Sequence, residues 1–339
     1  MNYELIGITV LWTFLYGYLI VSSIDFGAGF FAYYAKIKKK DHIINNLISR
    51  YLSPVWEVTN VFFVFFFVGI VGFFPATAYY YGTALLIPGS VALILIAIRG
   101  SFYAFNNYGS RNSTFYMFLY GATGLLIPAS LSTALTISEG GFLDEVDGDV
   151  NFLAKELFTS PYSWSVVFLS IVSVLFISAT FLTYYADRAD DQRARKTLRQ
   201  FALFWSTPTI VASLLVFMSL QMHNEDHYDK AVTEYWWMFG LSLVCFGIAS
   251  WFIFMEKRYG TAFIMVMLQF FFAFFGYGAS HLPYILYPYI NLHENVTNEA
   301  MALALVIAFT LGLLLLLPSL ILLMRLFLFD ADYVKGKKK

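Results

Sequence analysis

Apolar residues fill long runs along almost the whole chain, and short polar stretches separate them. A run of about 20 apolar residues crosses the hydrocarbon core of a bilayer as an α-helix. The runs are too long and continuous for barrel strands of about 10 residues. The pattern predicts nine transmembrane helices, at about residues 5–34, 54–74, 82–105, 114–138, 161–186, 200–220, 236–256, 260–286 and 299–328.

Composition agrees with this pattern, because 59% of the 339 residues are hydrophobic and only 13% are charged. We therefore expect an all-α membrane protein that forms a single integral domain over residues 1–339. Met1 to Tyr34 has no basic n-region, so it is expected to be a retained first span. Cys245 is the only cysteine, which excludes a disulfide within the chain and a cysteine metal cluster. Nothing indicates nucleic-acid binding.

Charged residues fix the expected orientation. Of the 21 Lys and Arg residues, 19 fall on one side of the nine-span arrangement, and the opposite side holds only Lys155 and Lys230. The opposite side is acidic instead, with Glu139, Asp144, Glu145, Asp147, Asp149, Glu156, Glu225, Asp226, Asp229 and Glu234. By the positive-inside rule, the N-terminus lies outside and the C-terminus lies in the cytoplasm. The external connections are too short for a substrate-binding ectodomain.

Asp25 lies within the first predicted span, past its midpoint toward the cytoplasm. A carboxylate there costs about 2.5–3.5 kcal/mol on insertion scales, so it should be protonated, paired or wetted and should face the bundle interior. Such a group suits the uptake and transfer of protons, with Ser22 and Ser23 beside it on the path. A structural interpretation is also open, in which Asp25 bonds a neighbouring helix and Gly27 and Gly29 allow close packing.

Glu57 follows Trp56 at the cytoplasmic start of the second span. It either admits protons or only completes the helix, because acidic residues are favoured at helix N-termini. Trp56 and Asn60 are four residues apart and share a helix face, as second-line polar groups. Arg99, near the inner end of the third span, is expected to snorkel to the interface, or to pair with a carboxylate such as Glu57.

Missing motifs narrow the function further. Haem sites in helical bundles need facing ligands, usually histidines at mid-depth, whereas here all five histidines except His281 are expected in loops. His281 and Gln269 are expected to be local hydrogen-bonding groups. We therefore expect no metal and no haem bound by this chain alone. The sequence also has no P-loop, HExxH or GxSxG motif, which leaves ATP-driven transport, zinc proteolysis and serine hydrolysis without support.

Two motifs carry a resemblance over nearly the whole chain. The first span contains a D-x-G-x-G element at Asp25, Gly27 and Gly29, and the second opens with W-[D/E]-x-x-N at Trp56, Glu57 and Asn60. Their order and spacing, together with the nine-span topology and Arg99, resemble subunit II of the cytochrome bd-type quinol oxidases. The resemblance implies two four-helix bundles plus one peripheral helix, in the bacterial cytoplasmic membrane.

The resemblance also implies partners and cofactors. Subunit II would form a heterodimer with a haem-bearing subunit I, which carries low- and high-spin haem b and haem d, in contact with membrane lipid and, in some complexes, a small single-span accessory subunit. The complex would oxidise quinol and reduce O2 to water with protons from the cytoplasm and without pumping. This chain would support subunit I and offer a proton path through Asp25, without catalytic residues of its own.

Two other hypotheses remain open from the residues. An intramembrane aspartate could couple ion and substrate movement in a proton-coupled secondary transporter. Alternatively, the chain could be a structural scaffold in which Asp25 only pins helices together.

Overall fold

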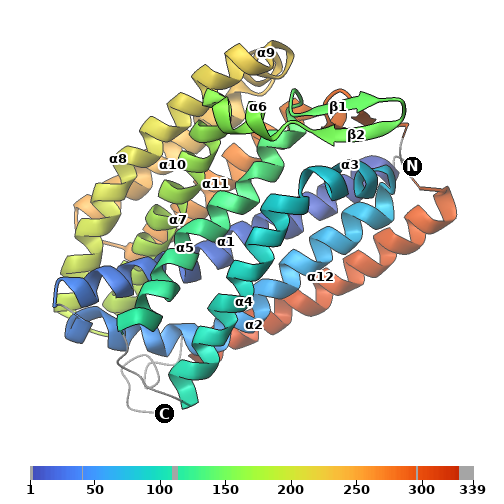
Figure 1. Cartoon of the computed structure of the whole chain (residues 1–339). Helices are drawn as coiled ribbons and strands as arrows, with labels where there is room; N and C mark the ends of the chain where they lie inside the picture. Colours follow the sequence, from blue (N-terminus) through green and yellow to red (C-terminus); the bar gives the residue numbers. More distant parts are fainter. Residues whose placement is uncertain (1–2, 40, 109–113, 295–296, 328–339) are drawn as a thin grey trace.

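The computed structural model describes the chain except residues 1–2, 40, 109–113, 295–296 and 328–339, and it leaves out the side chains at 41–42, 46, 49–58, 102–108, 323–324 and 326–327. Helices dominate the described part (Figure 1). They are α1 (Tyr3–Ile37), α2 (Asp41–Phe73), α3 (Ala76–Ala84), α4 (Leu86–Tyr108), α5 (Thr114–Ser138), α6 (Ala154–Thr159), α7 (Pro161–Arg188), α8 (Gln192–His223), α9 (Glu225–Thr233), α10 (Trp236–Phe254), α11 (Tyr259–His281) and α12 (Glu299–Phe327).

Seven of the described helices are long and apolar enough to cross a membrane: α1, α5, α7, α8, α10, α11 and α12. An eighth crossing results if the bent pair α3 and α4 counts as one span. The predicted span at 54–74 falls on α2, whose described apolar part, Thr59–Phe73, is shorter. The all-helical membrane class predicted from the apolar runs is therefore confirmed.

The predicted span at 82–105 differs from the structure. The axis bends by 77° at Leu85, between α3 and α4. Pro88 lies in the first turn of α4, where its missing N–H is no loss to the helix. The predicted single span is therefore two helices, with α3 at a steep angle to α4.

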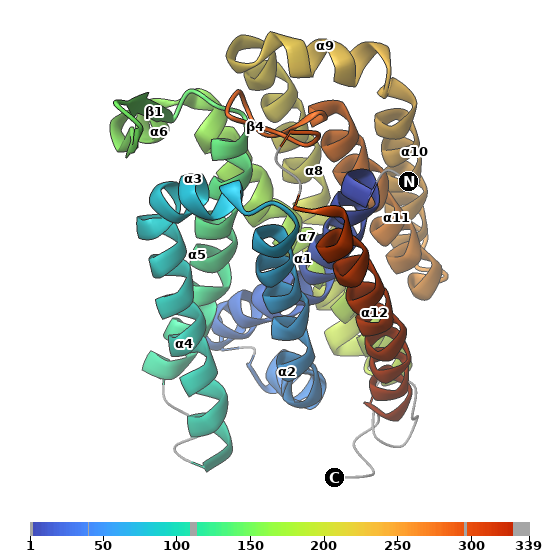
Figure 2. The same ribbon diagram turned by 90° about the vertical axis from the view of Figure 1, so that its right-hand side faces the viewer.

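Two small β-hairpins interrupt the helical pattern at one end of the molecule (Figures 1 and 2). Strands β1 (Leu143–Val146) and β2 (Asp149–Phe152) pair antiparallel, as do β3 (Tyr284–Leu286) and β4 (Ile290–Asn291). Apolar runs do not predict such short strands, because two to four residues carry no usable period. The hairpins cover the ends of the helices and connect them.

The core lies where α1 and α7 cross the other helices. Helix α1 packs against α2, α5, α7 and α12, and α7 packs against α8, α5 and α11. Helix α4 packs mainly on α5, and α10 packs on α11. The two largest apolar clusters contain Phe31, Phe176 and Phe181 in one, and Phe14, Phe73 and Phe74 in the other. Many side chains of α1 and α7 are thus buried.

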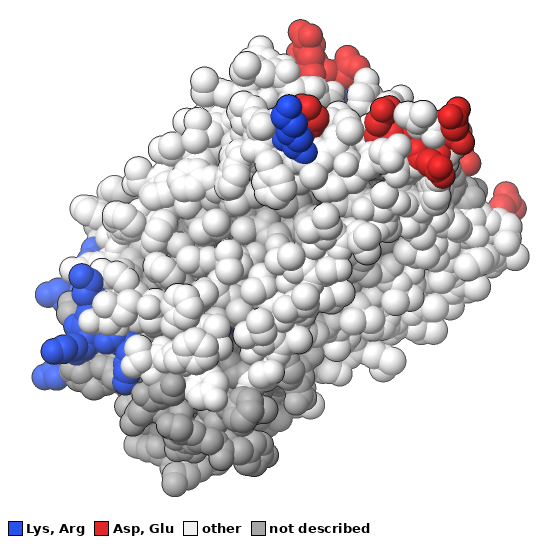
Figure 3. Space-filling view, in the orientation of Figure 1, with Lys and Arg blue, Asp and Glu red and all other residues white. Residues whose placement is uncertain are grey.

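Charged side chains gather at opposite ends of the molecule (Figure 3). Lys and Arg cover one end, and Asp and Glu cover the end that carries the hairpins and α9. The wide band between the ends carries few charges on this face. Lipid-facing surfaces have this composition because a charge in hydrocarbon is costly.

Three of the histidines expected in loops belong to helices, and His42 is one of them, near the start of α2. His223 is the last residue of α8, and His227 lies in the first turns of α9. Asn224 is the N-cap of α9, because its side-chain oxygen accepts a hydrogen bond from the His227 N–H at 3.2 Å. The polar sequence of this connection hid a short amphipathic helix.

Candidate functional site

Asp25 forms a buried ion pair with Arg99, between α1 and α4. The carboxylate residue is 2% exposed and the arginine 1%. Arg99 Nε donates to Asp25 Oδ2 at 2.8 Å, and Arg99 Nη2 donates to the Asp25 carbonyl oxygen at 2.6 Å. The charge within the first span is therefore compensated by a charge from a different helix.

Helix α5 completes the surroundings of this pair. Arg99 Nη1 donates to the Tyr120 carbonyl oxygen at 2.8 Å and to Thr123 Oγ1 at 3.2 Å. The Tyr120 hydroxyl donates to Asp25 Oδ1 at 3.2 Å. The guanidinium carbon lies 4.2 Å from the centroid of the Tyr120 ring and 5.2 Å from that of Phe26, within cation–π range. The guanidinium is thus solvated by protein groups on several sides.

Two glycines of α1 let α5 and α7 approach α1 closely around this site. A Cβ added at Gly29 would lie 2.6 Å from the Tyr120 carbonyl oxygen on α5. A Cβ at Gly27 would meet Ser178 on α7, whose hydroxyl donates to the Ile24 carbonyl oxygen at 2.8 Å. The D-x-G-x-G element therefore joins a charge to two close helix contacts, as the structural interpretation of Gly27 and Gly29 expected.

The other predicted residues, both those of the proton path and the second-line polar groups, lie at different places. Ser22 and Ser23 are buried in α1, one turn or less before Asp25. Asn60 is half-buried in α2. The side chains of Trp56 and Glu57 lie outside the described residues. The structure thus brings Arg99 to Asp25, and Ser22 and Ser23 are buried near Asp25 on the same helix.

The expectation that Arg99 snorkels to the interface is wrong. Its side chain turns inward because Asp25, the Tyr120 carbonyl and Thr123 together replace its hydration. Its carboxylate partner lies 74 positions earlier in the chain, so no local pattern around Arg99 announces the pair.

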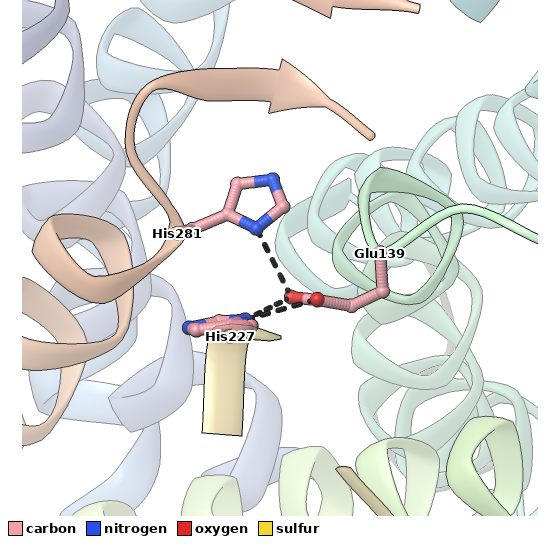
Figure 4. Close-up of side chains that lie close together, drawn as sticks. All are labelled: Glu139, His227 and His281. Carbon is pink, nitrogen blue, oxygen red and sulfur yellow. Dashed lines mark hydrogen bonds and ion pairs between the residues drawn. The ribbon is translucent and has the colours of Figure 1, made fainter. Parts of the chain in front are cut away.

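A second polar cluster lies at the acidic end and was missed by the sequence analysis (Figure 4). Glu139, directly after α5, points toward His227 from α9 and His281 at the end of α11. His227 Nδ1 lies 2.9 Å from both carboxylate oxygens, and His281 Nδ1 lies 3.4 Å from Glu139 Oε1. Tyr277 donates a very short hydrogen bond to Oε1.

Local backbone geometry positions this cluster. Gly140 and Gly141 have φ of +82° and +77°, a region that favours glycine, and they turn the chain sharply after Glu139. The Asn224 side chain caps α9 through its oxygen and donates to Glu139 Oε2 through Nδ2 at 3.0 Å. One amide thus fixes both the helix that carries His227 and the carboxylate that His227 faces.

The electrostatics of Glu139 favour its charged form. Burial by itself raises the pKa of this carboxyl. The charge and hydrogen bonding of His281 and His227 outweigh burial, so the pKa lies well below its ordinary value. Sequence analysis placed Glu139 only among the external acidic residues. Its partners His227 and His281 are 88 and 142 positions away, so no local pattern links them. The one signal in the sequence was His281, an isolated histidine at the end of an apolar run.

The fold and its two clusters define a multi-pass α-helical membrane protein with a charge pair in its core. The sequence model of the cytochrome bd terminal oxidase subunit II family matches residues 3–327. The putative cytochrome bd menaquinol oxidase subunit II of Bacillus subtilis (strain 168) is 31% identical over 342 residues, covering 98% of each chain. The structure of bd oxidase from Geobacillus thermodenitrificans matches with a TM-score of 0.86 and 57% identity, over 97% of this chain and 100% of that chain.

The chain belongs to the cytochrome bd terminal oxidase subunit II family. It is therefore a multi-pass bacterial membrane protein and a subunit of a quinol oxidase complex, which is an oxidoreductase. The resemblance drawn from the two short motifs is confirmed. Membership also favours the oxidase over the proton-coupled transporter.

Proposed function

We propose that this chain is the non-haem subunit of its oxidase, that it supports a haem-bearing subunit I and that it carries protons through Asp25. Quinol gives up electrons and protons near the outer face, and dioxygen takes those electrons together with protons from the cytoplasm to form water, without pumping. The family match over residues 3–327 carries the oxidase role. The buried pair of Asp25 and Arg99 carries the proton role.

The proposed topology has nine spans, with the N-terminus outside. Contacts among α1, α2, α4 and α5, and among α7, α8, α10 and α11, support two four-helix bundles, with α12 packed on α1 and α2 as the peripheral helix. The separation of basic and acidic ends supports a cytoplasmic C-terminus.

The low- and high-spin haem b and the haem d are proposed to lie on subunit I. In the part of this chain with described side chains, His223, His227 and His281 gather at the acidic end, and His293 pairs with Glu4. These four do not form a facing pair across the middle of a bundle, so the donor set does not fit a bis-histidine haem. No step in this chain is assigned to haem.

The geometry suggests which atom of Asp25 takes the proton. Oδ2 receives the short hydrogen bond from Arg99, whereas Oδ1 receives the longer one, at 3.2 Å, from Tyr120. A proton on Oδ1 neutralises the carboxylate, and Arg99 keeps its bonds to the carbonyl oxygens of Asp25 and Tyr120. The Arg99 guanidinium therefore keeps hydrogen-bond partners whether Asp25 is protonated or ionised. A proton relay next to a permanent charge needs this property.

The test is oxygen consumption per haem d in the purified complex, across pH. Asp25→Asn should slow turnover about 100-fold or more, since a positioned proton-transfer group typically contributes about 10²–10⁴-fold, while haem content falls less. Glu57→Gln should cause a smaller loss. Asp187→Asn, which removes a half-exposed partner of Arg195, is the control and should leave turnover unchanged. Normal turnover at every pH in an assembled Asp25→Asn complex contradicts the relay.

A further inference from the structure

We propose that Glu139, His227 and His281 form a binding site for a divalent transition-metal ion of the Zn²⁺ class. The three residues come from the end of α5, from α9 and from the end of α11 (Figure 4). A bound ion would therefore join three separate elements at the acidic end of the molecule. This site is independent of the proton path proposed at Asp25.

The donor atoms have the spacing that such an ion needs. One ligand atom from each residue lies within 4.8 Å of the other two. Zinc binds imidazole nitrogen at about 2.0–2.1 Å, so donors around a tetrahedral ion stand about 3.4 Å apart. His281 Nδ1 is already 3.4 Å from Glu139 Oε1, and His227 Nδ1 is 2.9 Å from Oε2. Small movements of the His227 and Glu139 side chains can lengthen the 2.9 Å separation to this value.

Ser280 orients His227 for metal binding. The Ser280 hydroxyl lies 2.8 Å from the Gly276 carbonyl oxygen and 3.0 Å from that of Tyr277, and both only accept. Its proton is therefore directed to the backbone, and it accepts the Nε2–H of His227 at 2.8 Å. Nδ1 faces Glu139 at 2.9 Å, so an ion that displaces the Nδ1 proton would bind the Nδ1 lone pair. A partner on the outer ring nitrogen is the usual support of a metal-binding histidine.

His281 presents a second ring nitrogen, Nδ1, to the same carboxylate. Its side chain is 9% exposed, and its Nδ1 points at Glu139. Its Nε2 is buried with no hydrogen-bond partner among the described residues. A metal bond at Nδ1 would give the ring a fixed place.

The donor set selects the class of ion. Two imidazoles and one carboxylate suit zinc and similar transition metals, whereas Ca²⁺ and Mg²⁺ prefer sets made of oxygen. Asn224 and Tyr277 donate to the two carboxylate oxygens of Glu139 and hold its plane. The site is built and nearly preformed.

The test uses the whole complex, first treated with a chelator and then equilibrated with Zn²⁺ and washed. We expect about one tightly held zinc per complex by mass spectrometry, lost in His281→Gln and Glu139→Gln. His293→Gln changes an exposed histidine of the same face and should keep the zinc. No retained zinc in the wild type, or equal zinc in His281→Gln and His293→Gln, overturns the proposal.

X-ray absorption at the zinc edge decides the matter if the variants do not assemble. The wild-type complex should show imidazole nitrogen and carboxylate oxygen at about 2.0–2.2 Å. A shell without imidazole scattering places the zinc elsewhere and overturns the proposal.

Discussion

At the scale of single residues, the buried guanidinium of Arg99 decides the chemistry of the core. It bonds the carboxylate and the carbonyl of Asp25 and also reaches α5. Breaking a buried ion pair by removing one partner is far more costly than replacing both, because one uncompensated charge remains. Arginine is also not interchangeable with lysine here, since only its planar fork reaches all these acceptors.

Arg99→Gln should therefore destabilise the complex by about 3–5 kcal/mol, whereas Asp25→Asn with Arg99→Gln should cost less than the sum of the two single changes. The measurement is the midpoint of thermal unfolding and the haem content of each purified variant. If the double variant lost as much as the sum, the two side chains would not interact and the pair would be irrelevant to stability.

At the scale of elements, close helix contacts explain why small residues flank Asp25. The backbone of α1 lies directly on α5 at Gly29 and on α7 at Gly27. Any added side-chain atom has to push these helices apart, because packed interiors have no room for even one methyl group.

Gly29→Ala should destabilise the complex by about 1–3 kcal/mol through overpacking. Gly247→Ala on α10 is the matched control, since an added Cβ there meets nothing within 4 Å. That control should be neutral or slightly stabilising, because alanine favours helices over glycine. Thermal unfolding of the two variants side by side makes the comparison, and equal midpoints would contradict the close-contact argument.

The same elements show what sequence can and cannot predict. Membrane helices can be predicted from the sequence, because each one is an apolar run that is recognisable by itself. The D-x-G-x-G element also pointed to Asp25. The partner of Asp25 was not readable, since Arg99 reaches it only through tertiary packing. The Glu139 cluster was harder still, because three ordinary residues on three elements meet only after α5, α9 and α11 have folded.

At the scale of the whole molecule, charge is divided between two ends, and this division is the physical basis of the proposed orientation. Acidic residues surround the β1–β2 hairpin, and basic residues surround the turn between α7 and α8. The two regions should therefore face opposite aqueous compartments.

Labelling with a membrane-impermeant maleimide in whole cells tests this orientation. In a Cys245→Ser background, Asp147→Cys at the tip of the hairpin should label in intact cells. Lys196→Cys at the start of α8 should label only after the membrane is opened. The reverse result would invert the topology and move Asp25 toward the outer face.

The pairing of Asp25 with Arg99 has a consequence for the synthesis and membrane insertion of the protein. The two residues are 74 positions apart, and bacterial chains grow at about 5–20 residues per second, so Arg99 is made about 4–15 s after Asp25. During that interval α1 has to hold an acidic group without the arginine. The nascent first helix should therefore stay beside the insertion machinery or at the bilayer surface. It should reach its final position in the membrane only after α4 has been synthesised and Arg99 can pair with Asp25.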